Sequence, residues 1–239
     1  MIPKKIHYCW FGRGAMPELA NKCIESWHEQ MPDYEYKLWT EDDFDISSVP
    51  YVKEAYEAKK YAFVSDYVRL WALYNEGGIY FDVDFYAYKS FDDLLDLNAF
   101  AGFEGSKHHP LMMGVVASRA NGEWIKEQLD SYTNRHFIHE KGTLDMTTNV
   151  KFITANMAKN VFVQNGQEQD YKDLHVFPVD YFCPRQTTGE YLRTNNTYCE
   201  HLGLNSWSEN SNGFKSMFLK LVGQKNATRL IKLKRKLFG

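Results

Sequence analysis

Two carboxylates stand one residue apart in the segment EGGIYFDVDFYAY, which runs from Glu76 to Tyr88. Alternate side chains of a β-strand share a face, so Asp82 and Asp84 are expected to point the same way, with Val83 on the other face. Two like charges this close repel each other, and a divalent cation held by oxygen ligands is the simplest group to offset that repulsion. A solvated turn is the alternative. The preceding glycines and the apolar residues IYF favour a buried strand end, where a metal could bridge to a diphosphate.

A carboxylate and a guanidinium three residues apart precede this segment, in the stretch SDYVRLWALYNEGG. Asp66 and Arg69 would share one face of a helix, because residues three apart are neighbours on a helix surface. Such a pair is often an exposed ion pair that contributes only about 0.5 kcal/mol. This pair, however, stands in an apolar helix that leads directly to the DVD segment, so it could hold the hydroxyls of a sugar.

Two further groups lie far from the DVD segment in the sequence. Trp10 follows the first expected strand in HYCWFGRG and offers a flat ring on which a base can stack, although a strand tryptophan is more often a core residue. The late segment HLGLNSW contains His201, Asn205, Ser206 and Trp207. An isolated histidine is usually structural, but here amide, hydroxyl and indole groups follow it, and together they could complete a metal shell and close over a ligand.

Alternating strands and helices are expected to position these groups. Strands predicted at KKIHYCWFG and YEYKLWT flank a helix at MPELANKCIESWHEQMP, which is the order of a parallel α/β sheet. A helical pattern from about Val52 to Asn75 ends at Gly77-Gly78 and leads into the DVD strand. Further strands are expected at NAFAGFE, LMMGVVAS and LHVFPVDYFCP, a strand that runs into a loop at TYCEHLGLNSWSEN, and helices at GEWIKEQLDSYTNRHF and around VKFITANMAKNVF. Open α/β sheets bind ligands at the carboxyl ends of strands, so we expect the chemistry there.

The charge of the chain is distributed unevenly. No acidic residue follows Glu209, so residues 210–239 carry +8, and the first 209 residues carry 20 basic against 31 acidic side chains, a net charge of −11. The 239 residues suffice for one α/β domain and are short for two. We expect that domain to span 1–212 and a basic helical tail to span 213–239. The acidic body would repel a polyanion, which argues against nucleic-acid binding.

The four cysteines have no CxxC spacing and are not accompanied by histidines at the spacing of zinc ligands, so neither a zinc site nor a disulfide framework is indicated. The amino-terminal MIPKKIHYCWFG lacks the apolar run of a signal peptide, and no window approaches 18 consecutive apolar residues. We therefore expect a cytoplasmic protein that does not span a membrane.

Three motifs together carry a family resemblance: IPKKIHYCWFG, SDYVRLWALYNEGGIYFDVD and HLGLNSW. They resemble glycosyltransferase family 32, the group of bacterial capsular-polysaccharide and yeast mannosyltransferase-like enzymes, and are similar to the catalytic domain of the large clostridial glucosylating toxins. The resemblance implies an α/β GT-A fold, a single Rossmann-like domain with a mixed central sheet and helices on both faces. It also implies a nucleotide-sugar donor, a divalent metal and retention of anomeric configuration.

The resemblance further assigns roles to residues of the first two motifs. Trp10 matches the tryptophan that stacks on uracil, with the backbone of Cys9 at the base edge. Asp66 and Arg69 match the pair that holds the donor sugar. Tyr80 lines the same site.

The metal ligands implied by the resemblance are Asp82, near ribose and metal, and Asp84, the direct ligand. The toxins use an acidic residue in the late motif, where this chain has His201, with residues 205–207 near the diphosphate. An imidazole ligand favours Mn²⁺ over Mg²⁺, because magnesium prefers oxygen-only octahedra. The metal would stabilise charge on the leaving nucleoside diphosphate. In a front-face retaining mechanism the leaving phosphate itself takes the acceptor proton.

The donor is expected to be a UDP-hexose, UDP-galactose or UDP-glucose, because uridine can be sandwiched against the single indole of Trp10. The acceptor would be a saccharide, lipid-linked, in capsular or cell-surface polysaccharide synthesis. A GDP-mannose-dependent mannosyltransferase and a nucleotide-sugar-binding module without turnover are the alternatives. A phosphatase of the haloacid dehalogenase type also uses a DxD, but its first aspartate is a nucleophile and a Thr or Val stands where this chain has Tyr86.

The basic tail carries an apolar stripe of Leu230, Leu233 and Leu237, with lysines and arginines on the remaining helix surface. This pattern is typical of an interfacial helix on anionic lipid, and a helix packed on the body is the alternative. Each basic side chain near an anionic surface contributes about 1 kcal/mol. The tail could therefore hold the enzyme at the inner face of the plasma membrane.

Overall fold

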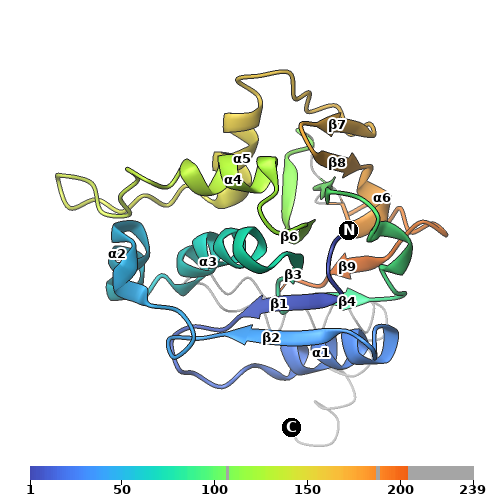
Figure 1. The fold of residues 1–239 in the computed structure, drawn as a ribbon, viewed down its shortest axis with the longest axis horizontal. Coiled ribbons are helices and arrows are strands. Elements are labelled where there is room, and N and C mark those ends of the chain that lie inside the picture. The colour runs from blue at the N-terminus through green and yellow to red at the C-terminus, as the bar shows by residue number, and fades with distance from the viewer. Residues whose placement is uncertain (106–107, 187–188, 204–239) are drawn as a thin grey trace, which may run out of the picture. The chain divides into compact units, whose positions relative to one another are not determined.

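A mixed seven-stranded sheet with the strand order β2-β1-β3-β6-β5-β8-β7 forms the centre of the molecule (Figure 1). The computed structural model describes residues 1–105, 108–186 and 189–203. The compact unit covers Met1–Gly203. The predicted boundary at residue 212 and the predicted tail helix lie outside the described residues and stay predictions.

The central sheet contains β1 (Lys5–Cys9), β2 (Glu35–Trp39), β3 (Gly78–Phe81), β5 (Ala99–Phe103), β6 (Leu111–Ser118), β7 (Gln169–Tyr171) and β8 (Leu174–Phe177). A second sheet pairs β4 (Phe85–Ala87) with β9 (Cys199–His201). The helices are α1 (Glu18–Gln30), α2 (Pro50–Glu57), α3 (Tyr61–Glu76), α4 (Glu123–Asp130), α5 (Asn149–Met157) and α6 (Val179–Phe182). Two short 3₁₀ turns span Ile46–Ser48 and Asp92–Leu94.

The strand directions bring several strand ends to one edge of the sheet. β1 runs parallel to β2 and β3, while β6 runs antiparallel to its two neighbours, β3 and β5. The carboxyl ends of β1, β3 and β5 therefore share an edge, which we call the carboxyl edge. Trp10, Asp82 and Glu104 follow these three strands, so chain segments far apart in sequence meet there.

Helices cover both faces of the sheet. Neighbouring residues of a strand point to opposite faces, and the ring of Phe81 packs 5.0 Å from Trp27 of α1, between ring centroids. The ring of Tyr80 instead lies 4.4 Å from the guanidinium carbon of Arg69 on α3. The helices α1 and α3 thus lie on opposite faces of β3 (Figure 1), which confirms the predicted arrangement.

The glycine pair that ends α3 is required by close packing. Gly77 and Gly78 have φ values of 67° and 114°, which lie in the left-handed region. A Cβ atom at Gly78 would lie 2.6 Å from the carbonyl oxygen of Lys5 in β1. The absence of a side chain therefore lets the chain turn from α3 directly into β3, which carries it to the DVD segment.

The DVD segment is a turn and not part of a strand, so the predicted alternation of Asp82 and Asp84 was wrong. β3 ends at Phe81, and the backbone N–H of Phe85 donates to the carbonyl oxygen of Asp82 at 3.1 Å, which closes a turn. The physical reason is the change of sheet: the chain leaves β6, its partner in the central sheet, and pairs as β4 with β9.

Two predicted helices were also too long. The helix expected from Val52 to Asn75 is divided into α2 and α3, because Lys59 between them has a φ of 58°. The helix expected at GEWIKEQLDSYTNRHF ends at Asp130. In LHVFPVDYFCP, Pro178 ends the strand, and the short helix α6 follows.

All four cysteines are free and buried. Among the helices of the described residues, none has both the length and the apolar character that are needed to cross a membrane.

Candidate active site

The guanidinium of Arg69 lies at the centre of a buried charged network below the carboxyl edge. Its side chain is only 5% exposed. Nη2 donates to Asp66 Oδ1 at 2.9 Å, Nη1 donates to the carbonyl oxygen of Met113 at 2.7 Å and to Asp82 Oδ2 at 3.3 Å, and Nε donates to the carbonyl oxygen of Ser65 at 3.2 Å. All three nitrogens are bonded, so the alternative of an exposed Asp66–Arg69 surface pair is wrong.

Asp82 is hydrogen-bonded to Tyr80 and Arg69 on one side and exposed on the other. Its Oδ1 accepts a hydrogen bond from the hydroxyl of Tyr80 at 2.8 Å and lies 3.3 Å from Arg69 Nη2. Its side chain is nevertheless 35% exposed, and burial raises its pKa. Tyr80 and Arg69 thus fix the orientation of a carboxylate that faces the edge of the sheet.

Asp66 is the most deeply buried carboxylate of this network. α3 presents it to Arg69 one helical turn later, as the spacing predicted, and the backbone N–H of Asn149 also bonds it. Burial raises its pKa to about 6, because the loss of solvation outweighs the charge of Arg69. A carboxylate in this setting can accept hydrogen bonds from hydroxyl groups of a ligand.

The pairing of β4 with β9 brings Asp84 and His201 together across the sequence. His201 Nε2 lies 3.0 Å from Asp84 Oδ2, and its ring stacks on Phe85 with centroids 4.7 Å apart. Burial acts to lower the pKa of His201, but the charge of Asp84 and the hydrogen bond to it prevail and raise that pKa to about 9. The side chain of His201 is 40% exposed and that of Asp84 is 12% exposed.

This pair fits part of a divalent metal site. Asp84 Oδ2 and His201 Nε2 already lie next to each other, and a metal would displace the proton between them. Both oxygens of Asp82 are engaged by Arg69 or Tyr80, so Asp82 is better placed to support the site than to fill it. Within residues 1–105, 108–186 and 189–203, no group of three His, Cys, Asp or Glu side chains converges on one metal position.

The groups expected to bind the base lie at the end of β1. Trp10 is half-buried and its Nε1 donates to the carbonyl oxygen of Gly14 at 2.6 Å, so it is not a core residue. The thiol of Cys9 is buried, and burial raises its pKa to about 12. Cys9 therefore has no reactive thiolate at neutral pH. The expected contact of its backbone with a base stays a prediction.

Sequence reasoning missed two polar residues of this region. Glu104 follows β5 at the carboxyl edge, burial raises its pKa, and its charge acts on His201. Its position directly after the apolar strand AFAGF was a signal that could have found it. Asn149 begins α5 and was hidden in a helical pattern. Asn205, Ser206 and Trp207 lie outside the described residues.

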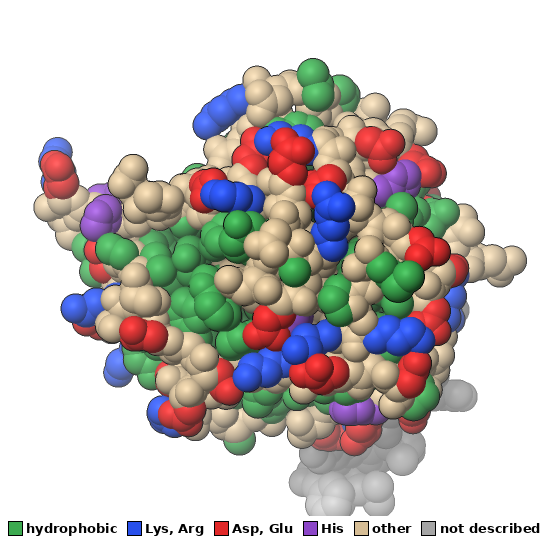
Figure 2. All heavy atoms as spheres, viewed as in Figure 1, with side chains coloured by type: hydrophobic (Ala, Val, Ile, Leu, Met, Phe, Trp, Pro, Cys, Tyr) green, Lys and Arg blue, Asp and Glu red, His purple; other side chains and the backbone are tan. Residues whose placement is uncertain are grey.

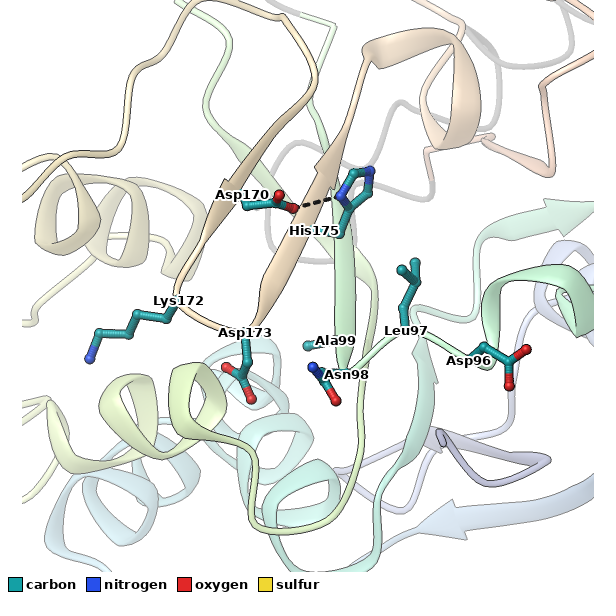
Figure 3. A pocket seen from close by; sticks show the side chains of 8 residues that line it. All are labelled: Asp96, Leu97, Asn98, Ala99, Asp170, Lys172, Asp173 and His175. Atoms are coloured by element: carbon teal, nitrogen blue, oxygen red, sulfur yellow. Dashed lines mark hydrogen bonds and ion pairs between the residues drawn. The ribbon is translucent and has the colours of Figure 1, made fainter.

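Two other surface features do not belong to this site. A hollow lies at the amino ends of β5 and β8, where Asp170 and His175 are hydrogen-bonded (Figure 3). Hydrophobic side chains gather on the surface over α3, between α2 and α4 (Figure 2). Neither feature brings polar groups together with the DVD segment.

Comparison with known proteins identifies similarity in the part of the chain that forms this site. The family model described as "Glycosyltransferase sugar-binding region containing DXD motif" matches residues 17–101, which contain α3, β3 and the DVD turn. Residues 17–101 are therefore similar to the sugar-binding region of DXD glycosyltransferases, as the motifs indicated.

Individual relatives extend the comparison. Inositol phosphoceramide mannosyltransferase 3 of Schizosaccharomyces pombe is 33% identical over 132 residues, which are 48% of this chain and 36% of that relative. Mannosyl phosphorylinositol ceramide synthase SUR1 of Saccharomyces cerevisiae is 31% identical over 104 residues, which are 42% and 27% of the two chains. The matches thus span about a third of these relatives.

A solved structure has a similar fold. It is titled as a glycosyltransferase involved in the glycosylation of the major capsid of PBCV-1, and it superposes with a TM-score of 0.50. It is 13% identical and the match covers 89% of this chain and 98% of that chain. This similarity and the mixed sheet confirm the predicted GT-A fold.

Proposed function

We propose that this protein is a glycosyltransferase that transfers a hexose from a nucleotide sugar to a saccharide acceptor, with retention of configuration and with the help of a divalent cation. The buried network of Arg69, Asp66, Asp82 and Tyr80 carries the proposal. It lies below the edge where the turn presents Asp84 and where β1 delivers Trp10. Sugar, diphosphate and base would thus bind along one edge of the sheet.

Each residue has a role that follows from its surroundings. Asp66 is ionised above its raised pKa and accepts hydroxyl hydrogen bonds of the sugar, while Arg69 keeps the two neighbouring carboxylates in place. Asp84 and His201 would hold the metal ion, which supplies positive charge to the leaving diphosphate. No protein base is required on the donor side, because the departing phosphate oxygen can accept the proton of the acceptor.

The donor sugar has two candidates. Trp10 at the end of β1 supports a uridine nucleotide, hence UDP-galactose or UDP-glucose. The names of the yeast relatives, which describe mannosyl transfer, favour GDP-mannose instead. Hexoses differ by single hydroxyl orientations, which one or two side chains of a pocket can distinguish.

A screen of nucleotide sugars for metal-dependent hydrolysis tests the proposed function. We expect one donor to be hydrolysed with Mn²⁺ and not in excess chelator, and Asp84→Ala to abolish the reaction. Asp96→Ala, in the hollow on the other edge of the sheet, is the matched control and should retain activity. Full activity in excess chelator would contradict the metal-dependent mechanism.

Calorimetry with nucleoside diphosphates separates the two donors. If UDP binds more tightly than GDP in the presence of Mn²⁺, and Trp10→Ala removes this preference, the uridine assignment is supported. Tighter binding of GDP would instead support a mannosyltransferase.

We also propose that residues 213–239 attach the enzyme to an anionic membrane that carries a lipid-linked acceptor, as in capsular or cell-surface polysaccharide synthesis. The eight basic side chains after Glu209 support this placement. The full chain should co-sediment with anionic vesicles at low salt, and a chain that ends near residue 212 should not. Equal pelleting of both chains at all salt concentrations would refute it.

A further inference from the structure

Four buried polar atoms around Asp66 have no hydrogen-bond partner in the described residues. They are the hydroxyls of Tyr51 and Tyr132, Nη1 of Arg135 and Nδ2 of Asn149. Tyr51, Tyr132 and Asn149 are 0%, 1% and 5% exposed. Buried polar groups are almost always paired, and each exception in a native structure calls for an explanation. Four exceptions at one place point to a missing partner.

The packing shows that these groups belong to one cluster. The rings of Tyr51 and Tyr132 cross at 81° with centroids 5.0 Å apart. The guanidinium carbon of Arg135 lies 4.7 Å from the ring centre of Tyr51 and 5.0 Å from that of Tyr132. The backbone N–H of Asn149 bonds Asp66, which ties the cluster to the proposed sugar-binding carboxylate.

The charge of Asp66 reaches the other members as well. Burial raises the pKa of Tyr51 and Tyr132, and the nearby Asp66 adds to both shifts. The four residues come from α2, α5 and the segment 131–148 after α4. Three parts of the chain thus converge on Asp66 of α3.

The charged side chains of the cluster are already paired with opposite charges. Arg135 is already paired with Asp145, with Nη2–Oδ2 and Nε–Oδ2 distances of 2.8 and 3.0 Å, and Asp66 is paired with Arg69. The groups that lack partners are phenol hydroxyls, an amide and one guanidinium nitrogen. Phenols both donate and accept hydrogen bonds, and so do the hydroxyls of a sugar. A neutral, hydroxyl-rich ligand matches this set better than a phosphate or a sugar carboxylate.

We propose that Tyr51, Tyr132, Arg135 and Asn149 form a subsite that binds hydroxyls of the transferred hexose beyond Asp66 and thereby selects the donor sugar. This inference rests on the proposed function and deepens it. The subsite favours a neutral hexose over a uronic acid, because a sugar carboxylate would add a negative charge beside Asp66 and Asp145.

The segment 131–148 supplies two members of the subsite, Tyr132 and Arg135. Glu54 of α2 fastens this segment: its Oε2 accepts hydrogen bonds from the backbone N–H groups of Phe137 and Ile138 at 2.8 and 2.9 Å. Since the four unpartnered atoms are buried, the subsite must open for a sugar to enter, and our proposal assigns this movement to the segment. Its closure would then exclude water from the bound sugar, which protects an activated donor from hydrolysis.

Isosteric variants test the subsite by calorimetry. Tyr51→Phe and Tyr132→Phe each remove one unpartnered hydroxyl. Tyr34→Phe is the matched control, because Tyr34 is also buried but its hydroxyl bonds Asp92 at 3.0 Å, away from the site. The affinities of UDP, GDP, UDP-galactose, UDP-glucose and GDP-mannose are measured with Mn²⁺ for the full chain and for each variant.

We expect the two subsite variants to bind the nucleoside diphosphates as the wild type does and to bind the matching nucleotide sugar about five-fold more weakly. The ligand-free melting temperature should not fall in these variants, because no hydrogen bond is lost. It should fall in Tyr34→Phe, whose nucleotide-sugar affinity should stay unchanged. This combination separates sugar binding from a merely structural role.

Two results would overturn this inference but leave the proposed function intact. One is nucleotide-sugar binding in both subsite variants that equals that of the wild type. The other is a lower ligand-free melting temperature in these variants with an equal loss of affinity for the nucleoside diphosphate and the nucleotide sugar. If the wild-type chain bound neither a nucleoside diphosphate nor a nucleotide sugar, the proposed function itself would fail.

Discussion

Arg69 and Arg135 have similar surroundings but differ in how completely their side chains are hydrogen-bonded. Arg69 and Arg135 both lie over aromatic rings, and both are paired with aspartates. Every nitrogen of Arg69 is bonded to a protein oxygen. Arg135 bonds Asp145 and the carbonyl oxygen of Thr147, but its Nη1 has no partner among the described residues.

This difference distinguishes the Arg69 network, whose hydrogen bonds are complete, from the Arg135 cluster, which we propose to bind a ligand. The Arg69 network is complete without substrate, so it can hold Asp82 and Asp66 in place before the donor arrives. The Arg135 cluster contains polar atoms without a partner among the described residues, and these are the atoms that we propose to bind the sugar. Changes in the first region should therefore damage both stability and turnover, and changes in the second should act mainly on sugar binding.

The largest expected effect comes from Arg69→Met. This change leaves Asp66 and Asp82 without their cation, and breaking a buried ion pair in this way costs about 3–5 kcal/mol of folding free energy. Urea unfolding of the variant and the wild type measures the loss. Arg69→Lys is the control: it keeps the charge but not the three-nitrogen geometry, and it should be less destabilised.

If Arg69→Met unfolded at the same urea concentration as the wild type, the network would not be the fixed framework that we describe.

A smaller effect, on turnover, is expected for Asp66→Asn. The variant keeps the size of the side chain but loses the charged acceptor, and misplacing a bound substrate can lower the rate about 100-fold or more. Steady-state kinetics with the identified donor measures it. Asp145→Asn is the matched variant in the Arg135 cluster and should lower turnover less, because Asp145 acts on the sugar only through Arg135. Equal losses in both would erase the distinction between the two regions.

The two aspartates should also respond to pH in opposite directions. Burial raises the pKa of Asp66 from 3.8 to about 6, so its contribution to stability is present below pH 4 and is lost as the pH rises through 6. For Asp145 burial opposes the shift, but the hydrogen bonds from Thr147 and Arg135 lower the pKa, so its contribution is lost as the pH falls.

Unfolding free energies of the wild type, Asp66→Asn and Asp145→Asn at several pH values check these signs. Between pH 4 and 6, the wild type should lose stability relative to Asp66→Asn, by on the order of 2 kcal/mol. Turnover should rise over the same range as Asp66 becomes ionised. A constant difference between wild type and Asp66→Asn across this range would show that Asp66 titrates normally.

The smallest expected effect is that of Tyr80→Phe. It removes one hydrogen bond to Asp82, which is worth about 1 kcal/mol, so thermal unfolding should reveal a modest destabilisation. Tyr132→Phe loses no hydrogen bond and should not be destabilised. If Tyr132→Phe were the more destabilised of the two, the hydroxyl of Tyr132 would have a partner within the protein.

Much of the candidate site could be predicted from local sequence. The spacing of Asp66 and Arg69 places them on one side of α3, and a helix keeps that relation wherever it packs. The glycines of Gly77-Gly78 and the apolar residues after them indicated a strand that ends at the DVD segment. The error there was local as well: a period-two pattern cannot tell a continuing strand from a turn that connects two sheets.

Long-range partners could not be predicted in the same way. The carbonyl oxygen of Met113 and the ring of Tyr80 meet Arg69 because β6 and β3 are adjacent in the sheet, which no spacing in the sequence expresses. The contact of His201 with Asp84 joins residues 117 positions apart. The sequence led us to expect that both residues bind a metal, but the contact itself depends on the pairing of β4 with β9.

The sequence by itself determined much of the order of strands and helices, and the DXD motif with the Asp66–Arg69 pair before it, which together carry the family resemblance. These properties depend on contacts within a few residues, where backbone geometry sets the distances. Only the tertiary structure decided that Arg69 is buried and fully bonded, that Asp84 meets His201, and that Tyr51, Tyr132 and Asn149 surround Asp66. Those contacts depend on strand register and on the packing of elements distant in sequence, which the pattern of any single segment does not contain.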